Sequence, residues 1–235
     1  MSREVVIVTG ASKGIGKAIS EKLASNNYDV IIFGRNTENL QRITQDLKVL
    51  NSNTTYFSGD VADKNFVNES VAKIISNYGK IDALINNAGV AYFEKFIDSS
   101  LVKFKEQIDT NLFGVYNFSK AVIDQMIKQN SGTIINISSQ AGKVGFEYGT
   151  MYAATKHAVM GFSRSLMLEV RKHNIRVISV CPGSVETDMI KDSPIHPEDT
   201  SKILQSEDIA EVVFTILKLP TRALVSEIEI RPNNP

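Results

Sequence analysis

The sequence predicts an α/β domain built on a doubly wound parallel sheet of about seven strands, with helices on both faces. Short β-branched runs alternate with longer helix-like stretches, and most runs are apolar at consecutive positions. Such alternation is typical of βαβ units with right-handed crossovers, and a strand covered on both faces is apolar throughout. The predicted strands are 5–8, 30–33, 54–57, 81–85, 133–137, 177–180 and 227–230. The predicted helices are 15–26, 37–49, 64–78, 99–129, 151–172 and 207–218.

Length and composition indicate one globular domain over residues 1–235, with 43% hydrophobic and 22% charged residues. The net charge is zero, which argues against nucleic acid and anionic membrane surfaces as partners. The apolar runs are too short to span a membrane, and the start lacks a signal-peptide core. Cys181 is the single cysteine, so no intrachain disulfide can form, and we expect a cytoplasmic protein. The three histidines show no metal-ligand spacing, so no metal site is expected.

The first predicted strand runs into a glycine-rich turn that opens the first predicted helix, Thr9-Gly10-Ala11-Ser12-Lys13-Gly14-Ile15-Gly16. Its three glycines permit a tight turn and let backbone N–H groups approach a pyrophosphate at the positive end of the helix. The alternative is merely a tight loop, but the position between strand and helix favours a Rossmann-type dinucleotide site. A Walker A loop is excluded because five residues separate Gly10 from Gly16, and Ala18 provides no hydroxyl.

The end of the second predicted strand indicates which nicotinamide cofactor binds. An acidic residue there would accept hydrogen bonds from the ribose of NAD and would repel a 2′-phosphate. The strand instead ends Phe33-Gly34-Arg35, with no acid at 33–36. The planar guanidinium of Arg35 suits a phosphate, and Lys13 adds a second cation. Both could also be solvated surface residues, but the pattern predicts NADP(H).

Tyr152 and Lys156 lie four residues apart in a predicted helix and therefore share one face. A free phenol has a pKa near 10, and an adjacent ammonium is expected to lower the pKa of Tyr152 toward the range useful for proton transfer. The pair alone occurs often by chance. Its context is the predicted strand 133–137 ending in Ser138-Ser139, whose hydroxyls can donate to a carbonyl oxygen that gains negative charge.

These motifs together resemble the short-chain dehydrogenase/reductase family over nearly the whole chain. The matching residues are Thr9-Gly10-x-x-x-Gly14-Ile15-Gly16, Asp60-Val61, Asn86-Asn87-Ala88-Gly89, Asn111, Ser139, Tyr152-x-x-x-Lys156 and Pro182-Gly183, in the family's order. The resemblance implies an oxidoreductase that passes a hydride between NADP(H) and a carbonyl or alcohol, with Tyr152 as general acid or base.

The resemblance also assigns roles to single residues. Ser139 is thirteen residues before Tyr152, as the catalytic serine of the family is, whereas Ser138 is expected to bond backbone locally. Lys156 is expected to hold the nicotinamide ribose as well as tune Tyr152. Asn111 is expected to position a water that links Lys156 to solvent, the alternative being a backbone-bonding role. The implied cofactor contacts are Gly10, Ser12, Lys13, Gly14, Ile15, Gly16, Arg35, Asp60, Val61, Asn87, Ala88, Gly89, Tyr152, Lys156, Pro182, Gly183, Val185 and Thr187.

Residues 183–206 are expected to form a substrate lid in which prolines interrupt any regular element. An apolar wall for a ketone or β-keto compound is expected from Met189, Ile190, Pro194 and Ile195 of the lid and from Ala91, Tyr92 and Phe93. Glu147 and Glu186 border the predicted pocket and are expected either to touch substrate or to be solvated.

Relatives of this size include 3-oxoacyl-carrier-protein reductases, but the short lid and the ending at 226–232 without Gly-Gly favour the 3-hydroxy-acid dehydrogenase and sepiapterin reductase branches. A carrier protein is therefore not favoured as a partner. The family implies a homodimer or homotetramer formed through two long helices, with Ala154, Ala158, Phe162 and Leu166 facing either the partner or the sheet. A non-catalytic NADP(H)-binding regulatory or scaffold protein is the alternative, although such relatives usually lack the serine, tyrosine or lysine.

Overall fold

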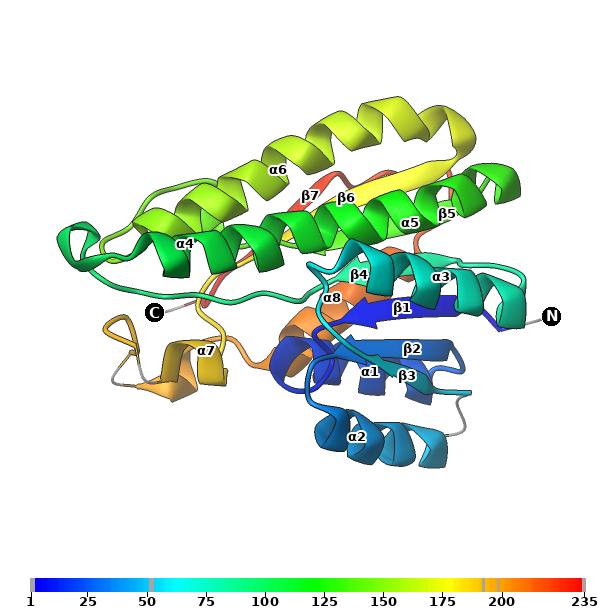
Figure 1. The fold of residues 1–235 in the computed structure, drawn as a ribbon, viewed down its shortest axis with the longest axis horizontal. Helices are drawn as coiled ribbons and strands as arrows, with labels where there is room; N and C mark the ends of the chain where they lie inside the picture. The colour runs from blue at the N-terminus through cyan, green and yellow to red at the C-terminus, as the bar shows by residue number, and fades with distance from the viewer. Residues whose placement is uncertain (1–2, 51–52, 192, 198, 234–235) are drawn as a thin grey trace.

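The computed structural model describes residues 3–50, 53–191, 193–197 and 199–233 (Figure 1). In this part of the chain a seven-stranded parallel sheet has the order β3-β2-β1-β4-β5-β6-β7. The strands are β1 (Val5–Thr9), β2 (Asp29–Gly34), β3 (Thr55–Ser58), β4 (Ala83–Asn86), β5 (Gly132–Ile137), β6 (Ile175–Pro182) and β7 (Glu227–Ile230). The predicted fold class is confirmed.

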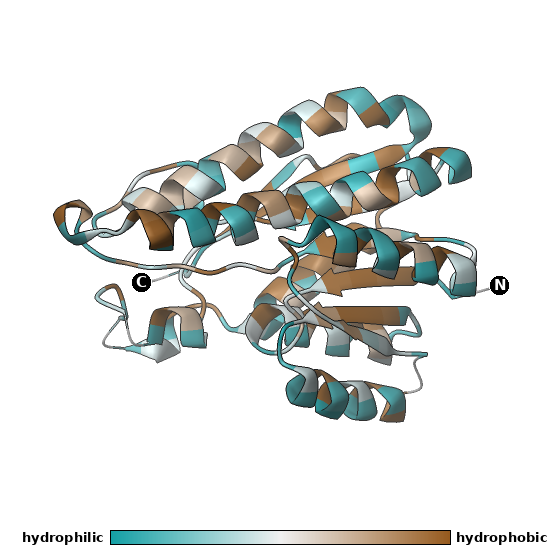
Figure 2. Ribbon diagram, in the orientation of Figure 1, coloured by the Kyte–Doolittle hydropathy of each residue, from teal (hydrophilic) through white to brown (hydrophobic). Residues whose placement is uncertain are grey.

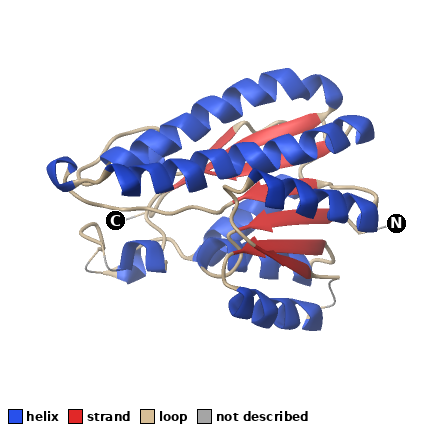
Figure 3. Cartoon of the chain, in the orientation of Figure 1, coloured by secondary structure: helices blue, strands red, loops and turns tan. Residues whose placement is uncertain are grey.

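The helices lie on both faces of this sheet (Figure 3). They are α1 (Gly14–Ser25), α2 (Thr37–Val49), α3 (Lys64–Tyr78), α4 (Leu101–Ile108), α5 (Gly114–Gln129), α6 (Thr150–Val170), α7 (Asp188–Lys191) and α8 (Ser206–Lys218). Short 3₁₀ turns occur at η1 (Phe96–Asp98), η3 (Gln140–Gly142), η4 (Arg171–His173) and η5 (Thr200–Lys202). Helices α1, α2 and α8 pack on one face, and α3, α5 and α6 on the other.

Two buried clusters explain why the strands are apolar at consecutive positions. In β1, Val6 and Val8 belong to the cluster under α1, α2 and α8, whereas Val5 and Ile7 belong to the cluster under α3 and α5. Successive side chains of a strand point to opposite faces, so each face of the sheet needs its own apolar set. The hydropathy colouring in Figure 2 shows the strands as a hydrophobic layer between helices of mixed colour.

Several predicted elements differ from the structure in their bounds or their continuity. The third strand begins at Thr55 rather than 54, and the fourth at Ala83 rather than 81. The predicted helix 99–129 is divided into α4, a π-helical turn η2 (Asp109–Phe113) and α5. A π-helical turn contains one residue more than an α-helical turn. The buried Asn111 in this turn bonds the backbone of Val90, and local periodicity does not reveal such a contact.

The segment 183–206 follows β6 at the carboxyl edge of the sheet. The expectation that it holds no regular element was wrong: α7 forms before Pro194, η5 follows Pro197, and Val185 forms a bridge with Leu204. The bridge brings the two ends of the segment together, so it is a folded excursion. Residues 192 and 198 lie outside the described residues.

The strand order reverses between β1 and β4, because β2 and β3 lie on one side of β1 and β4 to β7 on the other. Ligands of open α/β sheets bind beyond the carboxyl ends of the strands at such a reversal. In the described part of the chain, no helix combines the length and apolar character that crossing a membrane requires.

Candidate active site

The turns after β1 and β4 are tied together at the reversal point. The Thr9 hydroxyl accepts hydrogen bonds from the backbone N–H groups of Asn87 and Ala88, each at 3.0 Å. The Asn87 side chain donates to the carbonyls of Thr9 at 3.0 Å and Gly10 at 3.2 Å. The glycine-rich turn is therefore held by the Asn-Asn-Ala-Gly segment.

Two glycines of this turn are required by close approach. Gly10 has φ of 65°, and an added Cβ would lie 2.7 Å from Cα of Ala88. A Cβ on Gly16 would lie 2.4 Å from the carbonyl oxygen of Gly10. Gly16 is buried and does not line the cavity described next, and it packs α1 closely against the turn. Its predicted cofactor contact stays a prediction.

A cavity of about 840 Å³ opens at the carboxyl ends of the strands. Apart from Gly16 and Asn111, every predicted site residue lines it: Gly10, Ser12, Lys13, Gly14, Ile15, Arg35, Asp60, Val61, Asn87, Ala88, Gly89, Ser139, Tyr152, Lys156, Pro182, Gly183, Val185 and Thr187. Segments far apart in the sequence thus converge on one space large enough for a dinucleotide and a small substrate.

The cationic end of this cavity holds more positive charge than predicted. Arg35 lines it together with Lys17 and Arg42, which the sequence analysis did not single out. Arg42 lies in α2, whose Leu40, Ile43 and Leu47 are buried against the sheet. A second cationic residue in the helix that follows Arg35 was the feature of the sequence that could have predicted its place in the cavity. Lys13 is already partnered, because its ammonium lies 3.0 Å from the carboxylate of Asp188 in α7.

Tyr152 and Lys156 lie on one face of α6, as predicted, and both are buried, with 8% and 5% of their surface exposed. The Lys156 ammonium donates to the carbonyl of Ile137, the last residue of β5, at 2.9 Å and lies 5.6 Å from the centre of the Tyr152 ring. Ser139 follows that strand and caps η3 through its hydroxyl, which accepts from the Ala141 N–H at 3.1 Å. Ser139 lies near enough to the Tyr152 phenol to lower its pKa, so the three residues form one cluster.

Burial shifts both pKa values of this pair. It raises the pKa of the Tyr152 phenol to about 12, and the hydrogen bond from Ser139 opposes that shift. Burial lowers the pKa of Lys156 to about 8. We expected the Lys156 ammonium to lower the tyrosine pKa below its usual value, and with the protein's groups alone this was wrong. The Lys156 charge is hydrogen-bonded to the Ile137 carbonyl, and the loss of solvation at Tyr152 outweighs its effect on the phenol.

Asn111 lies beside this cluster rather than in the cavity lining. Its side-chain oxygen accepts from Val90 N–H at 2.8 Å, and its amide donates to the Val90 carbonyl at 2.9 Å and the Thr155 hydroxyl at 3.1 Å. It therefore fixes the chain after β4 against α6, the backbone-bonding alternative. The predicted water-positioning role stays a prediction.

The opposite end of the cavity is apolar and aromatic. Phe93 packs edge-on against Tyr152, with ring centres 5.4 Å apart, and contacts Phe146 at 6.0 Å. Met189, Ile190 and Ile195 line the cavity as predicted, whereas Ala91, Tyr92 and Pro194 do not. The hydroxyl of Tyr92 instead donates to Glu106 at 2.6 Å. Val144 and Phe146 also line the cavity and were not predicted; the available signal was two apolar residues shortly after Ser139.

Of the two acids predicted to border the pocket, Glu186 lines it and Glu147 does not. Ser138 lines it with a buried hydroxyl that has no hydrogen-bond partner among the described residues. No group of three or more His, Cys, Asp or Glu side chains suited to a metal ion occurs within the described ranges.

The sequence pattern of the short chain dehydrogenase family matches residues 4–197. This chain belongs to that family. An uncharacterized oxidoreductase of Staphylococcus epidermidis is 32% identical over 232 residues, covering 99% of this chain and 98% of the relative. A 3-oxoacyl-[acyl-carrier-protein] reductase of Chlamydia muridarum is 40% identical over 189 residues, covering 80% and 76%.

The fold agrees with that of solved members of the short-chain dehydrogenase family. The alcohol dehydrogenase of the archaeon Thermococcus sibiricus, solved with 5-hydroxy-NADP, superposes with a TM-score of 0.91 at 30% identity, covering 99% of this chain and 97% of that one. The chain is thus an oxidoreductase of this family along nearly its whole length.

Proposed function

We propose that this short-chain dehydrogenase passes a hydride between NADP(H) and a ketone or secondary alcohol, with Tyr152 as the general acid or base. The observation that carries the proposal is the convergence of Ser139, Tyr152 and Lys156 on one cavity whose other end is the glycine-rich turn. The serine lies near the tyrosine phenol and both line the cavity, so both hydroxyls can bond one substrate oxygen.

The chain's own residues fit a dinucleotide. Gly10 leaves a space that a Cβ would fill, next to the start of α1, where backbone N–H groups bind phosphate. When bound, the nicotinamide cofactor supplies or accepts the hydride. We assign its contacts to the cavity residues predicted from the sequence, with Lys17 and Arg42 added and Gly16 supporting the turn.

Each residue of the cluster has a distinct task in carbonyl reduction. Tyr152 is protonated at neutral pH, because its pKa is raised to about 12, and donates its proton to the substrate oxygen. Ser139 donates a hydrogen bond to the same oxygen as negative charge develops there. Lys156 is charged below about pH 8 and favours the phenolate left after proton transfer.

We assign NADP(H) rather than NAD(H) on charge. Arg35 and Arg42 both line the cavity, and neither forms an ion pair with a carboxylate in the part of the chain that is described. No acid occupies positions 33–36 at the end of β2, where it would repel a 2′-phosphate. The complex of the Thermococcus relative with 5-hydroxy-NADP supports the same assignment.

The apolar wall beside Tyr152 favours a substrate whose carbonyl carries an apolar or aromatic group. Phe93, Phe146 and Val144 form its fixed part, and Met189 and Ile195 form the part supplied by segment 183–206. We propose that this segment is a substrate lid. The acyl-carrier-protein reductase among the relatives makes 3-oxoacyl thioesters a class to test.

Two further properties belong to this proposal. A homodimer or homotetramer formed through α5 and α6 is supported by the exposed Phe113, Tyr116 and Leu168 on those segments. A cytoplasmic location is supported by Cys181, a free and buried thiol of the kind that reducing compartments maintain.

Turnover tests the function directly. We expect the protein to consume NADPH with at least one member of a panel of aryl ketones, β-keto esters and 3-oxoacyl thioesters, followed by loss of nicotinamide absorbance. Tyr152→Phe removes the proton and should lower kcat about 10²–10⁴-fold, with NADPH affinity changed less than twofold. Unchanged turnover in this variant removes Tyr152 from the mechanism, and no turnover by the wild type with tight NADPH binding favours a regulatory protein.

A further inference from the structure

The last strand of the sheet carries two carboxylates on the side of the catalytic serine. Strand β7 has the sequence Glu227-Ile228-Glu229-Ile230 and, among the described residues, pairs with β6 alone, at the edge of the sheet. Ile228 and Ile230 pack on the core cluster beneath α1 and α8. Because side chains alternate along a strand, Glu227 and Glu229 project to the opposite face, toward α6 and η3.

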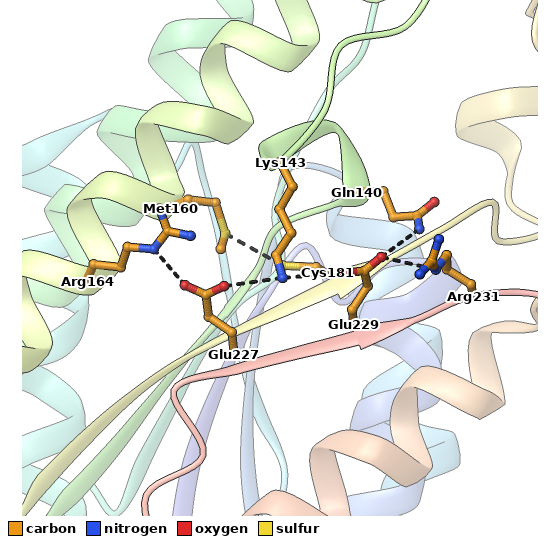
Figure 4. A network of polar contacts seen from close by, with 8 residues as sticks. All are labelled: Gln140, Lys143, Met160, Arg164, Cys181, Glu227, Glu229 and Arg231. Atoms are coloured by element: carbon orange, nitrogen blue, oxygen red, sulfur yellow. Dashed lines mark hydrogen bonds and ion pairs between the residues drawn. The ribbon is translucent and has the colours of Figure 1, made fainter.

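These carboxylates bind the segment that directly follows Ser139 (Figure 4). Glu229 accepts from the Gln140 amide at 3.1 Å and lies 3.5 Å from the Lys143 ammonium. Glu227 lies 3.2 Å from the same ammonium and accepts from Arg164 Nε of α6 at 2.6 Å. Lys143 thus sits between both acids, as Figure 4 shows.

The network is ionised at neutral pH. Hydrogen bonds from Arg164 and Gln140 hold the pKa values of Glu227 and Glu229 below the usual range for a carboxyl group. Arg231 adds an ion pair to Glu229 at 3.0 Å. Three cations and two anions share one set of contacts, so the positions of the side chains depend on one another.

The backbone of η3 offers few other polar ties to the sheet. The backbone N–H groups of Gly142, Lys143 and Val144 all donate to the carbonyls of Ser139 or Gln140 within the same turn. On its other side η3 is pressed against α6, since a Cβ on Gly142 would lie 2.8 Å from Met160 and 3.0 Å from the carbonyl of Lys156. The turn is therefore clamped between α6 and the two carboxylates of β7.

We propose that Glu229, supported by Glu227, is a positioning residue for Ser139. It acts through Gln140 and Lys143, which are one and four residues after the serine, and never touches the substrate. The proposal rests on the proposed function, in which Ser139 donates to the substrate oxygen. A donor displaced by about 1 Å can cost roughly 100-fold in rate, so a partly exposed network can control turnover while adding little to folding stability.

The test is a double-mutant cycle. Glu229→Ala should lower kcat with an aryl ketone roughly 10- to 100-fold, with NADPH affinity by fluorescence titration changed less than twofold and Tm lowered by only a few degrees. Glu229→Gln keeps an acceptor for Gln140 and should restore part of the lost kcat. Glu211→Ala, which removes the partner of Lys22 between α1 and α8, is the matched control and should leave kcat unchanged.

The second arm of the cycle uses Ser139→Ala. If Glu229 acts through the serine, Glu229→Ala should lower kcat/KM no further in the Ser139→Ala background. The positioning role is overturned if the double variant loses kcat/KM by the product of the two single losses. It is also overturned if kcat is unchanged in Glu229→Ala alone. Full turnover in Ser139→Ala overturns the serine's part of the proposed function instead, so the two failures are distinguishable. Should Glu229→Ala not fold, Glu229→Gln completes the same cycle.

Discussion

At the scale of single residues, the proposed preference for NADP(H) rests on Arg35 and Arg42, because both line the cavity beyond the end of β2. A guanidinium that binds the 2′-phosphate contributes nothing to a cofactor that lacks it. Arg35→Ala should therefore weaken NADPH about 10- to 100-fold, as expected for a charged hydrogen bond of about 1.5–3 kcal/mol, and NADH less than threefold. Dissociation constants from fluorescence titration check this. An equal loss for both cofactors contradicts the phosphate role.

The proposed role of Tyr152 gives alcohol oxidation a defined pH dependence. In the proposed mechanism oxidation needs the phenolate as base, and burial raises the pKa of this phenol to about 12. Between pH 6 and 8 Tyr152 is mostly protonated and Lys156, with its pKa near 8, is mostly charged. Log kcat/KM for oxidation should therefore rise by about one for each pH unit in this window, since the phenolate fraction rises tenfold.

The reverse reaction is the control for this profile. Carbonyl reduction uses the protonated phenol, so its kcat/KM should stay nearly flat from pH 6 to 8. A flat profile for oxidation under conditions where chemistry limits the rate contradicts Tyr152 as the base.

At the scale of elements, α7 is linked to the glycine-rich turn by the ion pair of Asp188 with Lys13, whose side chains are 64% and 68% exposed. So exposed a pair adds little stability, about 0–1 kcal/mol. Its carboxylate nevertheless lines a cavity that must receive phosphates. Asp188→Asn should tighten NADPH binding roughly two- to fivefold at low salt, with a smaller gain at high salt.

Asp188→Glu keeps the charge and is the matched variant for this link. It should bind NADPH like the wild type. Weaker NADPH binding in Asp188→Asn contradicts competition between Asp188 and the cofactor, and indicates that α7 must be held closed by Lys13.

Most of the helices, strands and turns could be predicted because local sequence patterns determine them. The apolar runs placed all seven strands within two residues at their starts, and the turn motifs placed the cavity lining. The π-turn at Asp109–Phe113 could not be predicted, since Asn111 bonds Val90, twenty-one residues earlier. The Lys13–Asp188 pair and the Gln140–Glu229 bond join residues 175 and 89 positions apart, beyond any local pattern.

The pKa of Tyr152 illustrates the same limit in the site. Its spacing from Lys156 was evident, but the pKa depends on how deeply α6 buries the phenol and where the ammonium points. Likewise Arg42, Val144 and Phe146 lie in the cavity only because their elements turn toward it. Motifs therefore located the reacting groups, and packing sets their electrostatics.

At the scale of the whole molecule, α6 offers a face of small and apolar residues that a second copy of the chain can cover. Ala154 and Gly161 are exposed on this helix, Ala158 is partly exposed between them, and Leu168 is 57% exposed near its end. Small residues on one helix face allow another helix to approach closely, and an isologous contact would pair this face with itself in a second copy.

We expect light scattering after size exclusion to give twice or four times the chain mass of 25.9 kDa. Ala158→Arg places a charge and bulk in the centre of the proposed contact, so it should shift the mass toward the monomer and lower Tm. Val49→Arg is the matched control, because Val49 is 85% exposed at the end of α2, away from α5 and α6. It should leave the mass unchanged. A wild-type mass of one chain, or an Ala158→Arg variant that assembles like the wild type, contradicts pairing through α6.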